Sequence, residues 1–319
     1  MRFAATKTAF ALGTLLFVLV FNFFLFRIAG NPIDDLIRGN PHLSEAGRER
    51  LIHDEGLDQS DLTQFRIYVS NTLHGDLGTS FQTNQPVSTM IRQALPNTLI
   101  LVGISTLLAT IIGTWLGIHA AAKRGSSTDT GITQTSLFLY AMPDFWAGMI
   151  LIWIFAVELH LFPTSQKSEP GGHFSTVGYM WNVTQHATLP IITLTIGILG
   201  SYVVIMRSAL ADTLREDFVT TAQAVGMPRH RVLQRATRNA ILPVVALSAI
   251  SFGFVISGAI VVETLFSWPG MGLLSYRAIL NKDYPVMEGV FLVASAAVII
   301  ANLIADLLYA YLDPRVRNS

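Results

Sequence analysis

Cysteine is absent from this chain of 319 residues, and charged side chains are scarce. The absence of cysteine excludes a disulfide framework, thiolate metal ligands and cysteine nucleophiles. Only 13% of the residues are Asp, Glu, Lys or Arg, against about 25% in a typical soluble domain, and so few charges do not cover the surface of a soluble protein of this size. The 21 basic and 21 acidic residues cancel, which removes any general case for nucleic-acid binding.

Long apolar runs take the place of the missing charges, with 51% hydrophobic residues and a mean hydropathy of +0.49. A helix of about 20 residues crosses about 30 Å of hydrocarbon. Six stretches have this length and composition: Phe10–Ile28, Asn97–Ala122, Ile132–Leu159, Ala187–Leu210, Ile241–Phe266 and Val286–Leu312. The basic start of the first would also suit a signal peptide, but no small-residue cleavage site follows, so we expect a retained helix. The sequence predicts an all-α membrane protein with six transmembrane helices.

Basic residues predict the orientation of these helices, because Lys and Arg are enriched in cytoplasmic loops. With the N-terminus inside, the cytoplasmic segments hold Arg2, Lys7, Lys123, Arg124, Arg207, Arg215, Arg229, Arg231, Arg235, Arg238, Arg315 and Arg317. The two short outer loops hold only Lys167, Arg277 and Lys282. We therefore expect a multi-pass membrane protein with both termini in the cytoplasm. Of these residues, Arg207 is expected to snorkel to the inner surface.

The polar stretch of residues 30–95 is rich in Asp, Glu, Arg, Gly and Asn. It follows the N-terminal transmembrane helix, residues 1–29, and is expected to form an extracytoplasmic subdomain, with Ser44 as a helix N-cap. The transmembrane core would then cover residues 96–312, and residues 313–319 would be a cytoplasmic tail.

A second polar segment, residues 211–240, lies on the predicted cytoplasmic side between the fourth and fifth stretches. Apolar residues recur at helical spacing before Gly226, which is a helix-stop signal, and Pro228 then starts a second short amphipathic helix. Two short helices joined at Gly-Met-Pro are typical of a docking element. The alternative is a solvent-facing connector, which would need only polar residues.

Several segments resemble one known family, the membrane permeases of dipeptide and oligopeptide ABC importers (the DppB/OppB type). The segments that carry the resemblance are GDLGTSF (Gly75–Phe81) with Pro86 and Val87, ALPNTLIL (Ala94–Leu101), MPDFWAGMILI (Met142–Ile152), LPIITL (Leu189–Leu194), the inner loop Glu216–Val245, ETLFSWPGMGLL (Glu263–Leu274), KDYPVMEG (Lys282–Gly289) and NLIADLLYAYLDPRVR (Asn302–Arg317). They occur in the family's order and cover the chain nearly end to end. The chain departs at Thr221–Gly226, where it has T-A-Q-A-V-G and the usual pattern is close to T-A-R-A-K-G. The loss of two positive charges leaves the choice of ATPase partner open.

The resemblance implies a type I ABC importer-like permease of the bacterial cytoplasmic (inner) membrane, with a cytoplasmic coupling helix between helices 4 and 5. Its implied partners are a second homologous permease, two cytoplasmic ATPase subunits, an extracytoplasmic solute-binding protein and a peptide substrate. The implied ATPase-coupling residues are Thr221, Ala222, Gln223, Ala224, Gly226, Met227 and Arg229. The chain has no Gly-rich phosphate loop ending in Gly-Lys-Ser/Thr. We therefore expect no enzymatic activity and no cofactor in this chain, with ATP and Mg²⁺ held by the ATPase subunits.

Three acidic residues are candidates for the translocation pathway or its gate. Asp144 lies about ten residues into the third stretch, which places it about 15 Å deep, near the midplane. Its carboxylate either lines the pathway, where it could face a peptide ammonium, or lies at the N-terminus of a new helical segment opened by Pro143. Glu263 and Asp306 lie near the ends of the fifth and sixth stretches and face either an interior gate or a polar rim. The eight His residues show no i, i+4 pair, so no metal site is expected.

Other functions remain as alternatives. A stand-alone secondary transporter or channel would need ion-coupling carboxylates or interrupted helices repeated in two halves, and no duplication is visible. A membrane enzyme would need a catalytic constellation, such as a nucleophile elbow, that the sequence lacks. Within the family, glutathione-like compounds or nickel chelates are alternative cargoes, because the external binding protein usually sets the choice.

The predicted orientation can be tested with a single cysteine placed at Asp58, since the native chain has none. A membrane-impermeant maleimide should label this cysteine in intact cells, whereas a cysteine at Arg215 should be labelled only after lysis. Labelling of the Asp58 position only after lysis would contradict the orientation, once denatured protein has shown that a partner does not shield the site.

Overall fold

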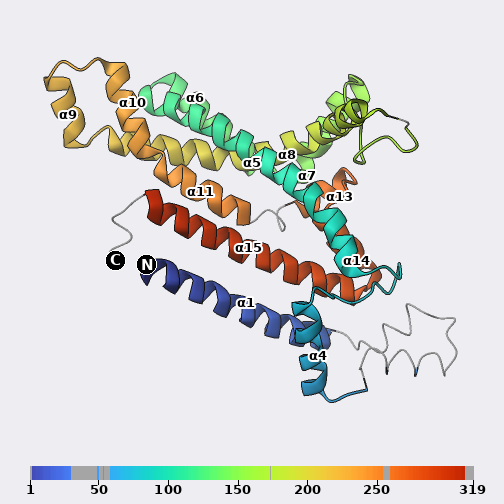
Figure 1. The fold of residues 1–319 in the computed structure, drawn as a ribbon. Helices are drawn as coiled ribbons and strands as arrows, with labels where there is room; N and C mark the ends of the chain where they lie inside the picture. Colours follow the sequence, from blue (N-terminus) through green and yellow to red (C-terminus); the bar gives the residue numbers. More distant parts are fainter. Residues whose placement is uncertain are drawn as a thin grey trace. The chain divides into compact units, whose positions relative to one another are not determined.

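The computed structural model describes residues 2–29, 49, 53, 58–172, 174–253 and 259–312. Within these ranges the regular elements are helices, and an isolated antiparallel bridge joins Thr79 to Pro86 (Figure 1). The helices are α1 Arg2–Ala29, α4 Asp61–Leu73, α5 Val87–Ala122, α6 Ser127–Ala141, α7 Asp144–Leu151, the π-helix η1 Ile152–Glu158, α8 Thr176–Thr213, α9 Asp217–Ala224, α10 Arg229–Ala240, α11 Leu242–Gly253, α13 Ile260–Leu265, α14 Met271–Asn281 and α15 Tyr284–Leu312. The expected N-cap Ser44 lies outside the described residues.

Four of the described helices are long and apolar enough to cross a membrane. They cover Ala5–Ile28, Val87–Ala122, Thr176–Thr213 and Tyr284–Leu307, and the bent pair α6 and α7 with η1 adds a fifth if it is counted as one span. The predicted stretch Ile241–Phe266 includes residues outside the described part of the chain. The prediction of an all-helical membrane protein is confirmed, whereas the count of six remains a prediction.

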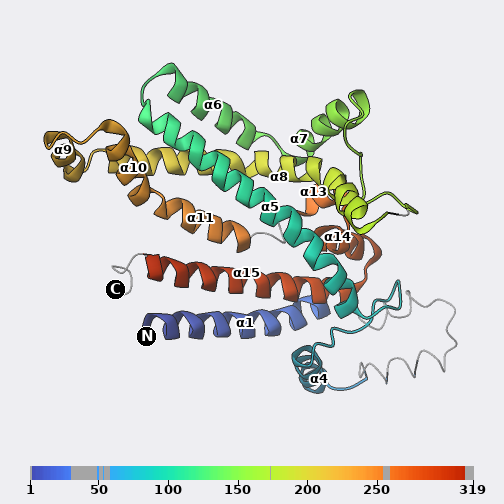
Figure 2. The ribbon, with the colours of Figure 1, turned by 45° about the horizontal axis from the view of Figure 1, so that its top comes forward.

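The third predicted stretch, Ile132–Leu159, is a broken helix and not a straight one. The segments Ser127–Ala141 and Asp144–Glu158 are bent by 99° at this break. Figure 2 shows the change of direction between α6 and α7. Between them, Met142 and Pro143 are extended, with ψ angles of 127° and 135°. Proline has no N–H and disfavours helical geometry at the residue before it, which explains why α6 ends here. Asp144 consequently begins a new helix instead of lying in the middle of one.

The chain divides into two compact units. Unit 1 comprises Met1–Thr98 with Pro269–Ile300, and unit 2 comprises Leu99–Trp268 with Ala301–Ser319. In unit 2, α5 approaches α8 closely at two glycines. A Cβ added to Gly113 would lie 2.5 Å from the Cβ of Tyr202, and one added to Gly117 would lie 2.7 Å from that of Met206. Small residues permit this approach, and the resulting van der Waals contact holds helices together in a membrane, where the hydrophobic effect between helices is lost.

In unit 1, a buried amide connects three helices. Asn22 of α1 is fully buried, and its Nδ2 donates to the Tyr68 hydroxyl of α4 at 3.0 Å and to the Glu288 carbonyl of α15 at 3.2 Å. Next to it, the Phe23 ring packs against Phe65 and Tyr68 with centroids 5.2 and 5.5 Å apart. Helices α1 and α15 run side by side in both views (Figures 1 and 2).

Two segments that carried the family resemblance meet in unit 1. The Asp283 carboxylate, only 3% exposed, accepts a hydrogen bond from the Ser80 hydroxyl at 2.5 Å and one from the Phe81 N–H at 3.1 Å. The Ser80 Oγ in turn accepts from the N–H groups of Gln82 and Thr83. GDLGTSF and KDYPVMEG are thus two halves of one polar clip that joins the loop before α5 to the start of α15.

The clip can be tested by Ser80→Ala. The variant should lower the free energy of unfolding by about 1–3 kcal/mol, because a buried carboxylate loses one of its donors. The purified chain should then show a lower Tm. Ser275→Ala is the control, since its half-buried hydroxyl in the same unit forms no hydrogen bond within the described residues. Equal Tm values for the two variants would show that the clip does not contribute to stability.

Candidate coupling and translocation site

The segment between the long helix α8 and α11 forms a helical hairpin of α9 and α10. Helix α9 ends at Ala224 with Val225 as its C-cap, and α10 begins at Arg229 directly after Pro228. The two short helices expected from the sequence are therefore present, and their connection is the expected Gly-Met-Pro. We call residues 217–240 the α9–α10 hairpin.

The turn of the hairpin is a Schellman motif. Gly226 has φ +77°, in the left-handed region that only glycine adopts without strain. The Met227 N–H donates to the Ala222 carbonyl at 3.0 Å, and the Gly226 N–H donates to the Gln223 carbonyl at 2.9 Å. These two bonds satisfy carbonyls that the end of a helix would otherwise leave open. The backbone at the tip of the hairpin is therefore held in one conformation.

Side chains inside the hairpin form a small core of their own. Val219 and Ala222 of α9 are buried against Val232 of α10, with Phe218 and Met227 packed beside them. Two of the seven predicted coupling residues, Ala222 and Met227, therefore hold the two helices together. The other five are exposed: Thr221, Gln223, Ala224, Gly226 and Arg229. Val225, which lies among them, is 74% exposed and is the most prominent apolar side chain of the tip.

The hairpin is attached to the long helices of unit 2 by packing and by one hydrogen bond. Ala236 and Ala240 of α10 are buried with Tyr202 and Met206 of α8. The Arg229 guanidinium donates to the carbonyl of Ala122, the last residue of α5, at 3.1 Å, which suits a cation at the negative end of a helix. The hairpin is therefore attached to both α8 and α5.

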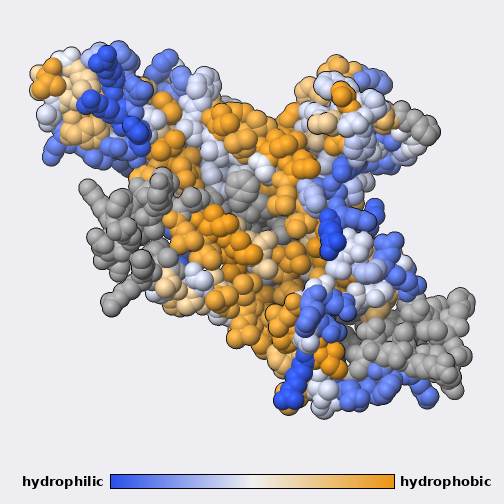
Figure 3. Space-filling model, viewed as in Figure 1, coloured by the Kyte–Doolittle hydropathy of each residue, from blue (hydrophilic) through white to orange (hydrophobic). Residues whose placement is uncertain are grey.

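Helix α10 is strongly basic on its exposed face. Arg229, Arg231, Arg235 and Arg238 are all exposed, and hydrophilic side chains gather over this helix in Figure 3. Lys and Arg of this density are typical of the cytoplasmic side of a membrane protein.

A buried ion pair links α6 to α8 in unit 2. The Arg207 guanidinium donates to both carboxylate oxygens of Asp129, at 2.5 and 2.8 Å, and the Asp129 side chain is only 4% exposed. The same carboxylate accepts from the Gly125 N–H at 2.9 Å. The expectation that Arg207 snorkels to the inner surface remains a prediction, since its side chain stays 28% exposed while it pairs with Asp129. The sequence did carry one local signal, Ser126 three residues before Asp129, which is the pattern of a capping box.

Asp144 lies on the contact between α7 and α8. It is the first residue of α7, its side chain makes no capping hydrogen bond, and its half-buried carboxylate rests on Gly197 of α8, where no Cβ would fit. Within the described residues this carboxylate has no hydrogen-bond or ion-pair partner. The structure places Asp144 at the start of a new helical segment, as one of the two alternatives expected, and a position on the translocation pathway remains a prediction.

The other two acidic candidates differ in burial. Glu263, in the first turn of α13, is 0% exposed. Of the two alternatives, this burial favours an interior position over a polar rim. Asp306 lies in α15 and is half-buried. Among the described residues, no group of three or more His, Cys, Asp and Glu is placed to hold a metal ion.

The chain has the features of a membrane permease. It combines apolar spans and a broken helix with an exposed hairpin that is attached to the ends of two spans. Residues 110–318 match the family described as "Binding-protein-dependent transport system inner membrane component", and the chain belongs to this family.

Relatives of similar length support this membership. The chain is 35% identical over 316 residues to the oligopeptide transport system permease protein AppB of Bacillus subtilis (strain 168), covering 97% of each protein. It is 34% identical over 334 residues to the di/tripeptide transport system permease protein DppB of Pseudomonas aeruginosa (strain UCBPP-PA14), covering 100% of this chain and 99% of the relative. It is 33% identical over 337 residues to the dipeptide transport system permease protein DppB of Escherichia coli (strain K12), with the same coverage.

The buried ion pair gives a testable prediction for unit 2. Asp129→Asn should lower the free energy of unfolding by about 1–3 kcal/mol, because the Arg207 guanidinium loses its counter-charge but, at 28% exposure, keeps access to water. The double variant Asp129→Asn, Arg207→Gln should recover part of this loss. Thermal unfolding of the native protein, the two single variants and the double variant gives a double-mutant cycle. Strictly additive effects would show that the two residues do not stabilise each other.

Proposed function

We propose that this chain is a permease subunit of an ATP-driven importer of dipeptides or oligopeptides, in which it forms half of the translocation pathway. The observation that carries the proposal is the α9–α10 hairpin, which presents an exposed tip and is attached rigidly to α8 and α5. A protein that carried out transport alone would not need such a surface. The peptide cargo rests on the relatives, whose names specify oligopeptide, di/tripeptide and dipeptide transport.

The proposed assembly contains a second homologous permease, two cytoplasmic ATPase subunits and an extracytoplasmic solute-binding protein. This chain would contribute six membrane spans with both termini in the cytoplasm and residues 30–95 outside. ATP and Mg²⁺ would be bound by the ATPase subunits, and the permease itself would catalyse no reaction.

The hairpin supplies the mechanical coupling. Closure of the ATPase subunits would displace the tip around Ala224, Val225 and Gly226, and α10 would transmit the displacement to α8 through Ala236 and Ala240. The Asp129–Arg207 pair would carry it on to α6. Access to the pathway would then switch between the two sides of the membrane, as in other rigid-body alternating-access transporters.

Asp144 is the proposed contact for the ammonium group of a peptide. Its carboxylate is half-buried, lies inside a predicted span and has no partner among the described residues, so an ammonium is the group that would compensate its burial. Glu263 and Asp306 are the proposed gate residues.

The broken helix α6–α7 is the observation that favours a second candidate, a stand-alone secondary transporter. Such transporters place discontinuous helices in both halves of a repeat. Within the described residues, a single pair shows this bend. Co-purification of the chain with an ATPase supports the importer, whereas uptake by this chain alone in vesicles supports the alternative. A peptide library, with glutathione and nickel chelates as competitors, tested on the partner binding protein would establish the cargo.

Docking of the tip is tested by Val225→Asp. If Val225 is buried against the ATPase, about 1.5–3 kcal/mol of burial is lost, and association of the ATPase should weaken about tenfold or more. The matched control is Val177→Asp, because Val177 is 77% exposed and lies at the opposite end of α8. Equal ATPase affinities for the two variants would refute the docking assignment.

Gly226→Val tests the conformation of the tip. Valine at φ +77° costs about 1–2 kcal/mol, and the variant should leave ATPase activity unresponsive to the loaded binding protein. Gly171→Val is the control for backbone strain, since Gly171 has φ +76° and equally open surroundings. Native import rates in the Gly226 variant would show that the tip need not keep this shape.

The role of Asp144 is tested by Asp144→Asn. Loss of a charge-assisted hydrogen bond should reduce uptake of peptides with a free amino terminus about tenfold or more, and leave uptake of N-acetylated peptides unchanged. Glu158→Gln, at the end of η1, serves as the control. If the Asp144 variant took up each peptide class at the same rate as the native protein, Asp144 would not bind the cargo. Its role would then be limited to the start of α7.

A further inference from the structure

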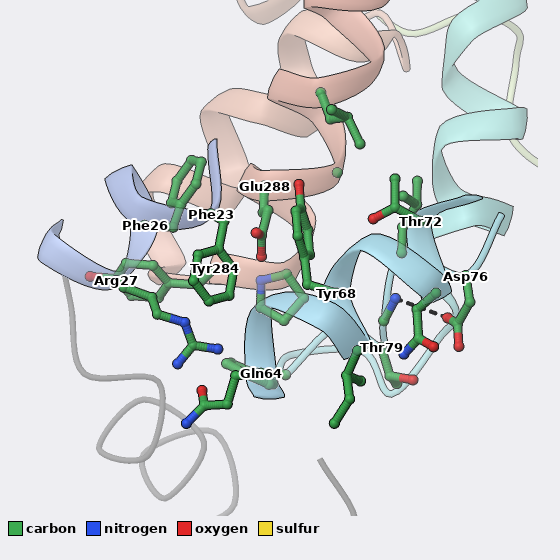
Figure 4. A pocket seen from close by; sticks show the side chains of 18 residues that line it. Phe23, Phe26, Arg27, Gln64, Tyr68, Thr72, Asp76, Thr79, Tyr284 and Glu288 are labelled. Atoms are coloured by element: carbon green, nitrogen blue, oxygen red, sulfur yellow. Dashed lines mark hydrogen bonds between the residues drawn. The ribbon is translucent and has the colours of Figure 1, made fainter. Parts of the chain in front are cut away.

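A cavity of about 170 Å³ lies within unit 1, where the end of α1, the start of α15, α4 and the loop after α4 come together (Figure 4). The spans Ala5–Ile28 and Tyr284–Leu307 meet the cavity at their Arg27 and Glu288 ends. The cavity therefore lies where the hydrocarbon gives way to the lipid headgroups.

Three charged side chains line this cavity. Asp76 accepts a hydrogen bond from the Gly78 N–H, whereas Arg27 and Glu288 line it without binding each other. Arg27 stands over the Phe23 ring at 4.6 Å from its centroid, and Glu288 lies one turn into α15 (Figure 4). Glu288 and Asp61 are the acidic groups that act electrostatically on Arg27. Within the described residues, neither Arg27 nor the Glu288 carboxylate has a hydrogen bond or ion pair. Charged groups at the edge of hydrocarbon are costly to leave without partners, so each calls for an opposite charge.

Several aromatic rings line the cavity together with these charges. Phe23, Phe26, Tyr68 and Tyr284 line the cavity. The Tyr68 hydroxyl accepts a hydrogen bond from Asn22, and burial raises the pKa of Tyr68 to about 12, so the ring stays neutral at physiological pH. The faces of such rings attract cations. The carboxylate and the aromatic wall together suit an ammonium, and the guanidinium suits a phosphate.

The outer face of α1 below the cavity is apolar and uncovered within unit 1. Phe17, Phe21 and Phe24 are 64%, 45% and 50% exposed. This phenylalanine face of α1 suits the acyl chain of a lipid whose headgroup lies in the cavity. The cavity is also smaller than the roughly 300 Å³ at which pockets for drug-sized ligands begin, which argues against a whole oligopeptide.

We propose that this cavity binds the headgroup of a phospholipid that carries both a phosphate and a primary ammonium, as in phosphatidylethanolamine. Arg27 holds the phosphate through its planar donor fork. Glu288 accepts hydrogen bonds from the ammonium, which a quaternary choline group cannot donate. Asn22 of α1 already connects this helix to α4 and α15, since it donates to the Tyr68 hydroxyl and to the Glu288 carbonyl. A lipid bound to Arg27 and Glu288 adds a further connection between α1 and α15.

The test is native mass spectrometry of the full chain after exchange into vesicles or nanodiscs of defined composition. The lipids are phosphatidylethanolamine, phosphatidylcholine and phosphatidylglycerol with identical acyl chains. We expect the native chain to retain phosphatidylethanolamine about tenfold more than either of the others. This comparison uses the unaltered chain, so it does not depend on the folding of a variant.

Variants then assign the two charges. Glu288→Gln and Arg27→Gln should each abolish the tenfold preference, while the exposed Arg277→Gln in the same unit and Glu158→Gln should keep it. Equal retention of the three lipids by the native chain would overturn the proposal. Displacement of phosphatidylethanolamine by millimolar dipeptide would overturn it too, and would assign the cavity to a peptide zwitterion. Neither result bears on whether the α9–α10 hairpin docks an ATPase.

Discussion

Hydrocarbon offers no hydrogen-bond partners to a backbone, so every N–H and C=O that crosses the bilayer must be satisfied within the protein. The long helices α1, α5, α8 and α15 meet this requirement through their own backbone bonds. The break at Pro143 is acceptable because α7 starts against α8, at the position where Gly197 leaves space for the Asp144 side chain. The same constraint explains why buried hydroxyls in α5 and α8 bond back to carbonyls one turn earlier, as Ser105 does to Leu101 and Thr193 to Leu189.

Helix association in this chain depends on close approach and on a few polar contacts, and not on the exclusion of water. Gly113 and Gly117 bring α5 against α8, and Asp129 with Arg207 joins α6 to α8. Such contacts have few alternative arrangements, because a buried bidentate pair loses its stabilisation when it shifts by even one residue. These contacts therefore join α5, α6 and α8 within unit 2.

The α9–α10 hairpin separates two roles that the sequence places side by side. Ala222 and Met227 point into its core, while Val225 and Gly226 are exposed at the tip. The Schellman motif permits this division, because it reverses the chain at a single left-handed glycine and still satisfies the last carbonyls of α9. Substitutions at neighbouring positions should therefore differ in effect. Those at Ala222 or Met227 should disturb the fold of the hairpin, whereas those at Val225 or Gly226 should affect the proposed contact with a partner.

Local signals in the sequence determined much of this protein. Apolar runs predicted the spans, Pro143 before Asp144 indicated a new helical segment as one alternative, and Gly226 before Pro228 predicted the turn of the hairpin. These features depend on residues within a few positions of each other, so composition and spacing were enough. The resemblance to a permease family likewise rested on short segments in a fixed order.

Only the tertiary structure decided which distant residues meet. Arg207 and Asp129 are 78 positions apart, and Ser80 and Asp283 are 203 apart. No periodicity connects such pairs, because their contact follows from how whole helices pack against each other. The burial of Glu263 and the meeting of Arg27 and Glu288 around one cavity have the same origin. Each depends on neighbours that the fold brings from several elements, and the local sequence contains no record of them.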